Sequence, residues 1–136
     1  MTQEEKQILL KDLCARLPFG IVCRVKIERD FEKPYETDVI LSQHNISYVF
    51  DLGYEWIWCK PYLRPMSSMT EEEKKYISER CGFSIVGPIG DKCELIMPVI
   101  AADWLIDFYN EHHFDYRGLI PLELAREAKE GMYKTE

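Results

Sequence analysis

The sequence predicts a single α+β domain over residues 1–136, in which a bent antiparallel sheet packs against about four helices. Segments with apolar residues at alternate positions predict strands, and segments with apolar residues three or four positions apart predict helices. Both patterns recur along the chain. Apolar residues make up 46% of the sequence, enough for one core, whereas the parts on either side of residues 61–69 are each too small for a core of their own.

The first predicted element is a helix over residues 3–16. Thr2 and Glu5 have the spacing of a capping box, in which each side chain bonds the backbone N–H of the other residue. Apolar residues then recur at helical spacing as far as Leu17, and Pro18 and Gly20 end the pattern.

Alternation predicts several strands in the first half of the chain. From Gly20 to Ile27 apolar residues alternate with Arg24 and Lys26, which indicates one buried and one solvated face. Residues 28–38 are rich in acids and include Pro34, as expected of a solvated loop. Three further strands are predicted at Thr37–Ser42, Ile46–Leu52 and Glu55–Cys59, the last with Trp56 and Trp58 on a shared face.

The second half begins with a connector at residues 61–69, because Pro61 and Pro65 disfavour a strand there. Thr70 and Glu73 repeat the capping-box spacing and predict a helix over residues 71–81. The remaining predicted elements are a hairpin of Phe83–Val86 and Cys93–Met97, a helix from Val99 through Tyr109, and a last helix from Pro121 to near Gly131.

Composition excludes several classes of function. Acids outnumber basic residues by 24 to 17, and because the formal charge of −7 repels phosphate backbones, we expect no nucleic-acid binding. No apolar run approaches the roughly 20 residues of a membrane span, and the polar start lacks the apolar core of a signal peptide. Five cysteines without a CxxC pair are typical of reduced, buried thiols. We therefore expect a cytoplasmic protein without membrane contact.

Three segments resemble a known family: residues 60–73 (KPYLRPMSSMTEEE), residues 104–120 (WLIDFYNEHHFDYRGLI) and residues 9–18 (LLKDLCARLP). The family consists of short uncharacterised proteins frequent in gut anaerobic bacteria and in their phages and mobile elements. Residues 24–58 and 82–97 look like its variable part. The resemblance implies a bacterial cytoplasm and an accessory gene of a phage or mobile element, and it supplies no activity, cofactor or catalytic residue.

The densest group of polar and aromatic residues lies at His112–Arg117. His112, His113 and Asp115 either bind a metal or act as acid and base, or they pack and cap the end of a helix. Asp115, Tyr116 and Arg117 either form a recognition site, with Arg117 gripping a carboxylate or phosphate, or an internal pair that fixes a turn.

Aromatic residues offer a second candidate surface. Trp56, Trp58, Tyr62 and Trp104 either fill the core or line a protein-binding patch. A strand that is apolar on both faces must be covered twice or expose one side, which suggests an interface, with another copy as one candidate partner. Glu71–Glu73 fit the start of a helix and could also bind a cation.

These features predict a non-enzymatic interaction or accessory protein that binds an unknown protein partner or itself. The predicted contact residues are Trp56, Trp58, Tyr62, Arg64, His113, Asp115, Tyr116 and Arg117. We assign no catalytic residue, metal ligand or cofactor. The alternatives are a small metal-assisted hydrolase using His112, His113 and Asp115, and an acidic decoy of a nucleic-acid-binding protein, with its acids in the Glu28–Asp38 loop and at Glu123, Glu127 and Glu130 of the last helix.

Overall fold

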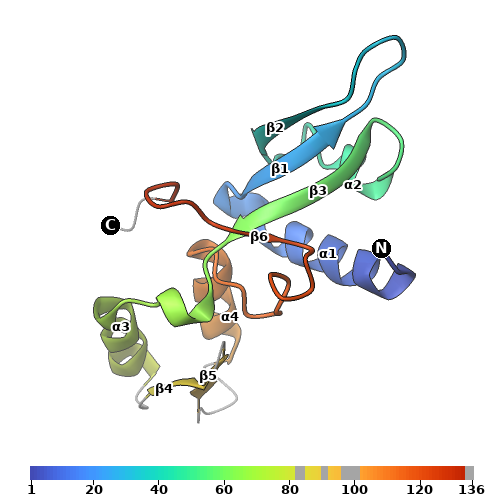
Figure 1. The fold of residues 1–136 in the computed structure, drawn as a ribbon. Helices are drawn as coiled ribbons and strands as arrows, with labels where there is room; N and C mark the ends of the chain where they lie inside the picture. Colours follow the sequence, from blue (N-terminus) through green and yellow to red (C-terminus); the bar gives the residue numbers. More distant parts are fainter. Residues whose placement is uncertain (82–84, 90–91, 96–101, 134–136) are drawn as a thin grey trace.

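The computed structural model covers residues 1–136 and describes the backbone at residues 1–81, 85–89, 92–95 and 102–133, and the side chains at residues 1–80 and 104–133. The predicted single α+β domain is confirmed. A four-stranded open sheet with helix α1 (Gln3–Arg16) forms one part of the molecule. Helices α3 (Glu71–Cys81) and α4 (Ala102–Glu111) with a two-stranded sheet form the other (Figure 1).

Helix α1 (Gln3–Arg16) begins and ends as its sequence predicts. Thr2 and Glu5 form the capping box, with Thr2 N donating to Glu5 Oε1 at 3.0 Å and Glu5 N donating to Thr2 Oγ1 at 3.1 Å. A short 3-10 helix, η1 (Leu17–Phe19), follows, and Gly20 then adopts a left-handed backbone with φ of 69°. Leu9 and Leu13 are buried against the sheet, so α1 covers one of its faces.

The sheet has the order β2-β1-β3-β6, with β1 at Val22–Ile27, β2 at Tyr35–Ile40, β3 at Trp56–Leu63 and β6 at Arg126–Glu127. β1 pairs antiparallel with β2 and β3, as predicted, whereas β6 runs parallel to β3. The sheet is therefore mixed, although mostly antiparallel. Cys23, Val25 and Ile27 alternate inward as predicted. The loop between β1 and β2 is shorter than predicted, because β2 begins at Tyr35.

The prediction that Trp56 and Trp58 share a face is wrong. In the pairing of β3 with β1, Trp58 lies opposite Lys26 and Trp56 lies opposite the next residue, Ile27. Ile57 is therefore an extra residue in β3, a bulge that turns Trp56 and Trp58 to opposite faces. Trp56 therefore lies on the core side with Ile27, and it is buried. Trp58 lies on the outer side with Lys26.

The prediction that residues 61–69 form only a connector is also wrong at its start, because β3 continues through Leu63. Proline has no backbone N–H to donate to a neighbouring strand. Pro61 is tolerated in β3 because β6 pairs only with Tyr62 and Leu63, so β6 offers no carbonyl that would need a donor at Pro61. The connector then contains a 3-10 helix, η2 (Met66–Ser68).

Two further predicted elements differ from the structure. The predicted strand at Ile46–Leu52 contains a single helical turn, α2 (Ser47–Phe50), preceded by a turn in which Asn45 bonds Ser42 N and the Ile40 carbonyl. The predicted last helix does not form, and residues 121–131 contain turns and β6 instead. Glu123 has a left-handed φ of 62°, which is incompatible with an α-helix.

The second part of the molecule contains α3 (Glu71–Cys81), the antiparallel pair β4 (Ile85–Ile89) and β5 (Lys92–Leu95), and α4 (Ala102–Glu111). The predicted helix over 71–81 and the predicted hairpin are confirmed. The hairpin strands differ in their bounds from the prediction, because Gly87 and Pro88 belong to β4 rather than to the turn. The ends of the predicted elements at Phe83, Met97, Val99 and Ile100 lie outside the described residues.

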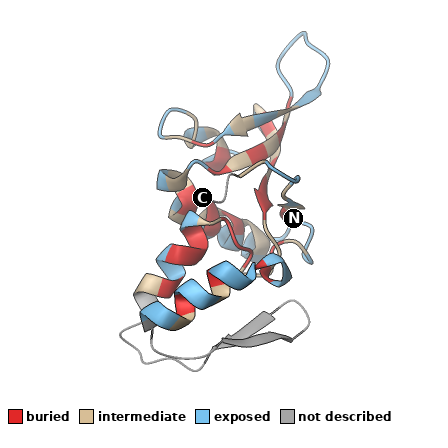
Figure 2. Cartoon of the chain, turned by 90° about the vertical axis from the view of Figure 1, so that its left-hand side faces the viewer, coloured by how far each residue is buried: buried red, intermediate tan, exposed pale blue. Residues whose placement is uncertain are grey.

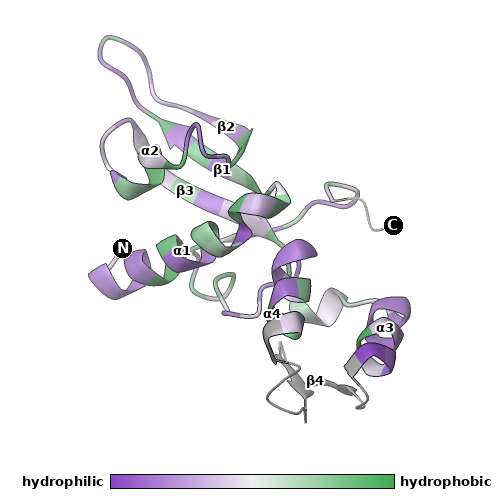
Figure 3. Cartoon of the chain, turned by 180° about the vertical axis from the view of Figure 1, so that it is seen from behind, coloured by the Kyte–Doolittle hydropathy of each residue, from purple (hydrophilic) through white to green (hydrophobic). Residues whose placement is uncertain are grey.

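The core has two clusters that correspond to these two parts. One lies between α1 and the sheet, and the other contains Ile77, Leu105, Phe108, Tyr109 and Phe114 between α3, α4 and the turn after α4. Buried residues are frequent along α4 (Figure 2), and apolar residues are interspersed with polar ones along α1 and β1 (Figure 3). None of the helices in the described residues has the length and apolarity needed to cross a membrane.

Candidate functional site

Arg117 belongs to a buried ionic cluster rather than to an open recognition site. Asp12 accepts hydrogen bonds from Arg16 Nε at 2.9 Å and Arg16 Nη2 at 3.1 Å, and from Arg117 Nη1 at 2.8 Å. Asp12 and Arg16 are completely buried, and the Arg117 side chain is 18% exposed. Asp12, Arg16 and Arg117, which we call the Asp12 cluster, fix helix α1 to the turn after α4.

Asp115 and Tyr116 also make internal contacts. The Asp115 carboxylate accepts hydrogen bonds from Leu119 N at 2.7 Å and Ile120 N at 2.9 Å, so that both of its oxygens hold the backbone of the following turn. The Tyr116 hydroxyl donates to Asn110 Oδ1 at 2.9 Å. Two arginine side chains of the Asp12 cluster lie near the Tyr116 ring.

The side chains of His112 and His113 lie in different environments. His113 is buried, and its ring stacks on Tyr133 with centroids 3.8 Å apart. Burial lowers the pKa of His113 to about 4, so the ring is neutral at neutral pH. His112 instead packs on Phe108, with its Nδ1 3.9 Å from Glu73. Within the described residues no three His, Cys, Asp or Glu side chains are arranged to hold a metal ion.

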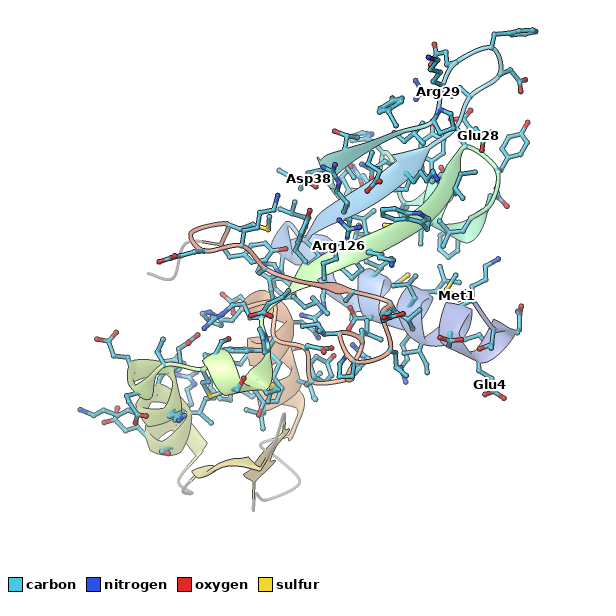
Figure 4. The ribbon with its side chains drawn as sticks, in the orientation of Figure 1. Met1, Glu4, Glu28, Arg29, Asp38 and Arg126 are labelled. Atoms are coloured by element: carbon cyan, nitrogen blue, oxygen red, sulfur yellow. The ribbon has the colours of Figure 1, made fainter. Side chains whose placement is uncertain are left out.

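The aromatic side chains of β3 are also mostly covered. Trp56 and Tyr62 are buried, and the Tyr62 hydroxyl donates to Asp38 at 2.9 Å. Trp58 is half-buried, with Lys60 and Arg126 each 5.3 Å from its ring centroid. Asp38 and Arg126 are labelled in Figure 4.

Arg64 connects the predicted contact residues to a pocket. Its guanidinium bonds Glu73 in a bidentate manner, at 2.9 and 2.7 Å, and lies over the Phe114 ring at 4.2 Å. Its backbone bonds His113 and Asp115, which ties the connector to the turn after α4. Half of the predicted contact residues are buried and half are partly exposed; the partly exposed ones are Trp58, Arg64, Tyr116 and Arg117.

The pocket lies between α3 and α4 and has a volume of about 790 Å³. Capping fixes its α3 wall, because Thr70 N donates to Glu73 Oε1 at 3.0 Å and Glu73 N donates to Thr70 Oγ1 at 3.2 Å. We call it the α3–α4 pocket; it is lined by Thr70, Glu71, Glu72, Glu73, Tyr76, Trp104, Asp107, Phe108, Glu111 and His112.

Three aromatic rings form one wall of this pocket. The ring centroids of Tyr76, Trp104 and Phe108 lie 5.5 to 5.8 Å from one another. Phe108 is buried, whereas Tyr76 is 48% exposed and Trp104 is partly exposed. The outer rings thus present aromatic surface to a ligand.

The carboxylates of the pocket fall into two groups. Burial opposes ionisation of Glu73, but the hydrogen bonds from Arg64 and Thr70 and the charge of Arg64 together outweigh it and lower the pKa of Glu73 below the usual range. Glu71 pairs with Lys74 at 3.3 Å. Glu72, Asp107 and Glu111 are exposed, and no ion pair among the described side chains includes them. The pocket is therefore negatively charged.

Little in the sequence indicates the α3–α4 pocket. Glu71–Glu73 fit the first turn of the helix over residues 71–81, and Trp104 and Phe108 fit the buried face of a helix. Neither pattern requires a pocket. Asp107 and Glu111 are one helical turn apart on α4, but nothing in their spacing indicates that α3 faces them. No protein-family model, curated protein or solved structure matches the chain, so the family resemblance remains a prediction and the indication of function comes from the site itself.

Proposed function

We propose that this chain is a non-enzymatic interaction protein whose α3–α4 pocket binds a basic side chain of a partner protein. The observation that carries the proposal is that Glu72, Asp107 and Glu111, which form no ion pair with the described side chains of residues 1–80 and 104–133, border a pocket with an aromatic wall. Carboxylates attract a cation, and aromatic faces stabilise it through their negative quadrupole.

The molecule itself provides an example of such a contact. The guanidinium carbon of Arg80 lies 5.5 Å from the Trp104 ring centroid. The same geometry suits an arginine or lysine side chain that enters from a partner. The pocket volume of about 790 Å³ falls in the usual range of ligand pockets and accommodates such a side chain with its neighbouring backbone.

The alternative functions have less support. His112, His113 and Asp115 make separate contacts, so they offer no common site for a metal-assisted hydrolase. An acidic decoy would need its acids on one face. The helix expected to carry Glu123, Glu127 and Glu130 does not form, and at the end of the Glu28–Asp38 segment Glu36 and Asp38 pair with Arg126 and Lys129, which partly neutralises these acids.

The test is a titration of the full chain with N-acetyl-arginine methylamide and with N-acetyl-glutamine methylamide, followed by NMR. We expect the arginine compound to shift the indole N–H of Trp104 and the glutamine compound to leave it unchanged. Binding of a single side chain should be weak, at about millimolar Kd.

Charge removal in the pocket provides the decisive variant. Asp107→Asn with Glu111→Gln should weaken arginine binding about tenfold, which corresponds to about 1.4 kcal/mol. The matched control is Glu4→Gln with Glu130→Gln, which removes the same charge from exposed sites outside the pocket and should leave affinity unchanged. Equal weakening by both pairs, or equal binding of the two compounds, would contradict the proposal.

A further inference from the structure

The loop between β1 and β2 carries an aromatic side chain that has no role in packing. Phe31 is fully exposed, and its backbone has a left-handed φ of 68°, which is uncommon for a bulky residue. The loop extends beyond the body of the molecule (Figure 1), and its residues 28–34 are all exposed (Figure 2). Nothing in the fold thus requires a phenylalanine at this position.

Further exposed aromatic residues emerge from the same end of the sheet. Tyr35 is 43% exposed and begins β2 opposite Ile27, and Tyr54 is 79% exposed in the connection before β3. Glu28 N donates to the Glu55 carbonyl at 2.9 Å, so this connection is bonded directly to the base of the loop. Phe50, 52% exposed, lies at the end of α2 in the same connection.

We call Phe31, Tyr35, Phe50 and Tyr54 the aromatic end. Single exposed apolar residues are common on proteins and need no explanation. Four large ones on two adjoining segments are different, because aromatic side chains are typical anchors of protein interfaces.

Acidic residues surround the aromatic end. Glu28, Asp30 and Glu32 lie in the loop, and the Arg29 side chain is 3.9 Å from Glu55, which partly neutralises it. Glu28 and Arg29 are labelled at the base of the loop in Figure 4. Lys33 is the other basic residue of the loop.

We propose that the aromatic end docks into a partner protein at an apolar hollow bordered by lysine or arginine side chains. The acids repel an anionic lipid surface and nucleic acid. They also repel a second copy of this chain, whose net charge is −7 and whose pocket is acidic. A basic protein surface is the remaining partner that complements both the rings and the charges.

This surface is independent of the α3–α4 pocket. The loop lies at one end of the molecule and α3 at the other, both in Figure 1 and in the reverse view of Figure 3. Either surface can therefore be lost without removing the other.

The experiment selects peptides from a random library displayed on phage, using the immobilised full chain, and measures the affinity of the synthetic peptides for variants. We expect a class of peptides that combines apolar residues with lysine or arginine. Its affinity should fall at least tenfold with Phe31→Ser and with Tyr54→Ser. Leu122→Ser, which removes an exposed apolar side chain elsewhere, should leave the affinity unchanged.

Further measurements separate this proposal from other uses of Phe31. Because the ring makes no packing contact, the melting temperature of Phe31→Ser should equal that of the unmodified chain; a lower value would show a role in folding and overturn the proposal. Peptides that bind Phe31→Ser equally well, or that are rich in acids, would also overturn it. So would Phe31-dependent binding to phosphatidylglycerol vesicles, or Phe31-dependent dimers in sedimentation.

Discussion

The Asp12 cluster and the α3–α4 pocket both contain carboxylates, but the carboxylates have different hydrogen-bond partners in the two places. Asp12 is completely buried, and two arginines supply its hydrogen bonds. In the pocket, Asp107 and Glu111 remain exposed beside aromatic rings, and no described side chain forms an ion pair with them. A conspicuous set of charged residues in a sequence therefore need not be the set available to a ligand. The cluster should govern stability, and the pocket should govern binding.

The largest expected effect is on the cluster. Asp12→Ala leaves Arg16 buried without its carboxylate, which should lower the free energy of unfolding by about 3–5 kcal/mol. Urea denaturation measures this change. Asp107→Asn, which removes one charge from the pocket, should change the same free energy by less than about 0.5 kcal/mol. Equal losses in the two variants would remove the distinction between the two regions.

The next effect is a pH dependence that arises from His113. Its pKa is about 4 in the folded chain and 6.5 in the unfolded chain, so below pH 6.5 the unfolded chain binds a proton that the folded chain does not. Stability should therefore fall as the pH is lowered from 6.5 to 4, by about 3 kcal/mol in total.

His113→Asn isolates this contribution, because asparagine does not titrate and tolerates the left-handed φ of 62° at this position. Urea denaturation at several pH values should show a flatter profile between pH 6.5 and 4 for this variant. An unchanged slope would show that other groups cause the pH dependence.

A smaller effect is expected at Asp115. Asp115→Ala leaves the backbone N–H groups of Leu119 and Ile120 without their acceptor, at a cost of about 2 kcal/mol. Asp115→Asn retains one acceptor oxygen and should cost about half as much. Thermal unfolding with both variants checks the order, and a larger loss for asparagine would contradict the assignment.

Local signals made part of the fold predictable. Thr2 with Glu5 and Thr70 with Glu73 predict the starts of α1 and α3 because a capping box depends only on residues three apart. Alternation in β1 predicts its buried face in the same way. These contacts require no knowledge of distant parts of the chain.

The errors arise from contacts between distant segments. The bulge that separates Trp56 from Trp58 depends on pairing with β1, and the parallel pairing of β6 with β3 replaces a helix that the sequence around Pro121 favours. The sequence indicated Asp115 and Arg117 because of their type, but it could not show that Asp12 lies beside Arg117.

Stability and arginine binding, measured on the same variants, separate the Asp12 cluster from the α3–α4 pocket. We predict that Asp107→Asn with Glu111→Gln loses affinity for N-acetyl-arginine methylamide about tenfold at unchanged unfolding free energy. Arg117→Gln should lower the unfolding free energy and, in the protein that remains folded, leave affinity unchanged. A loss of affinity in Arg117→Gln that equals the loss in the pocket variant would contradict the assignment of binding to the α3–α4 pocket.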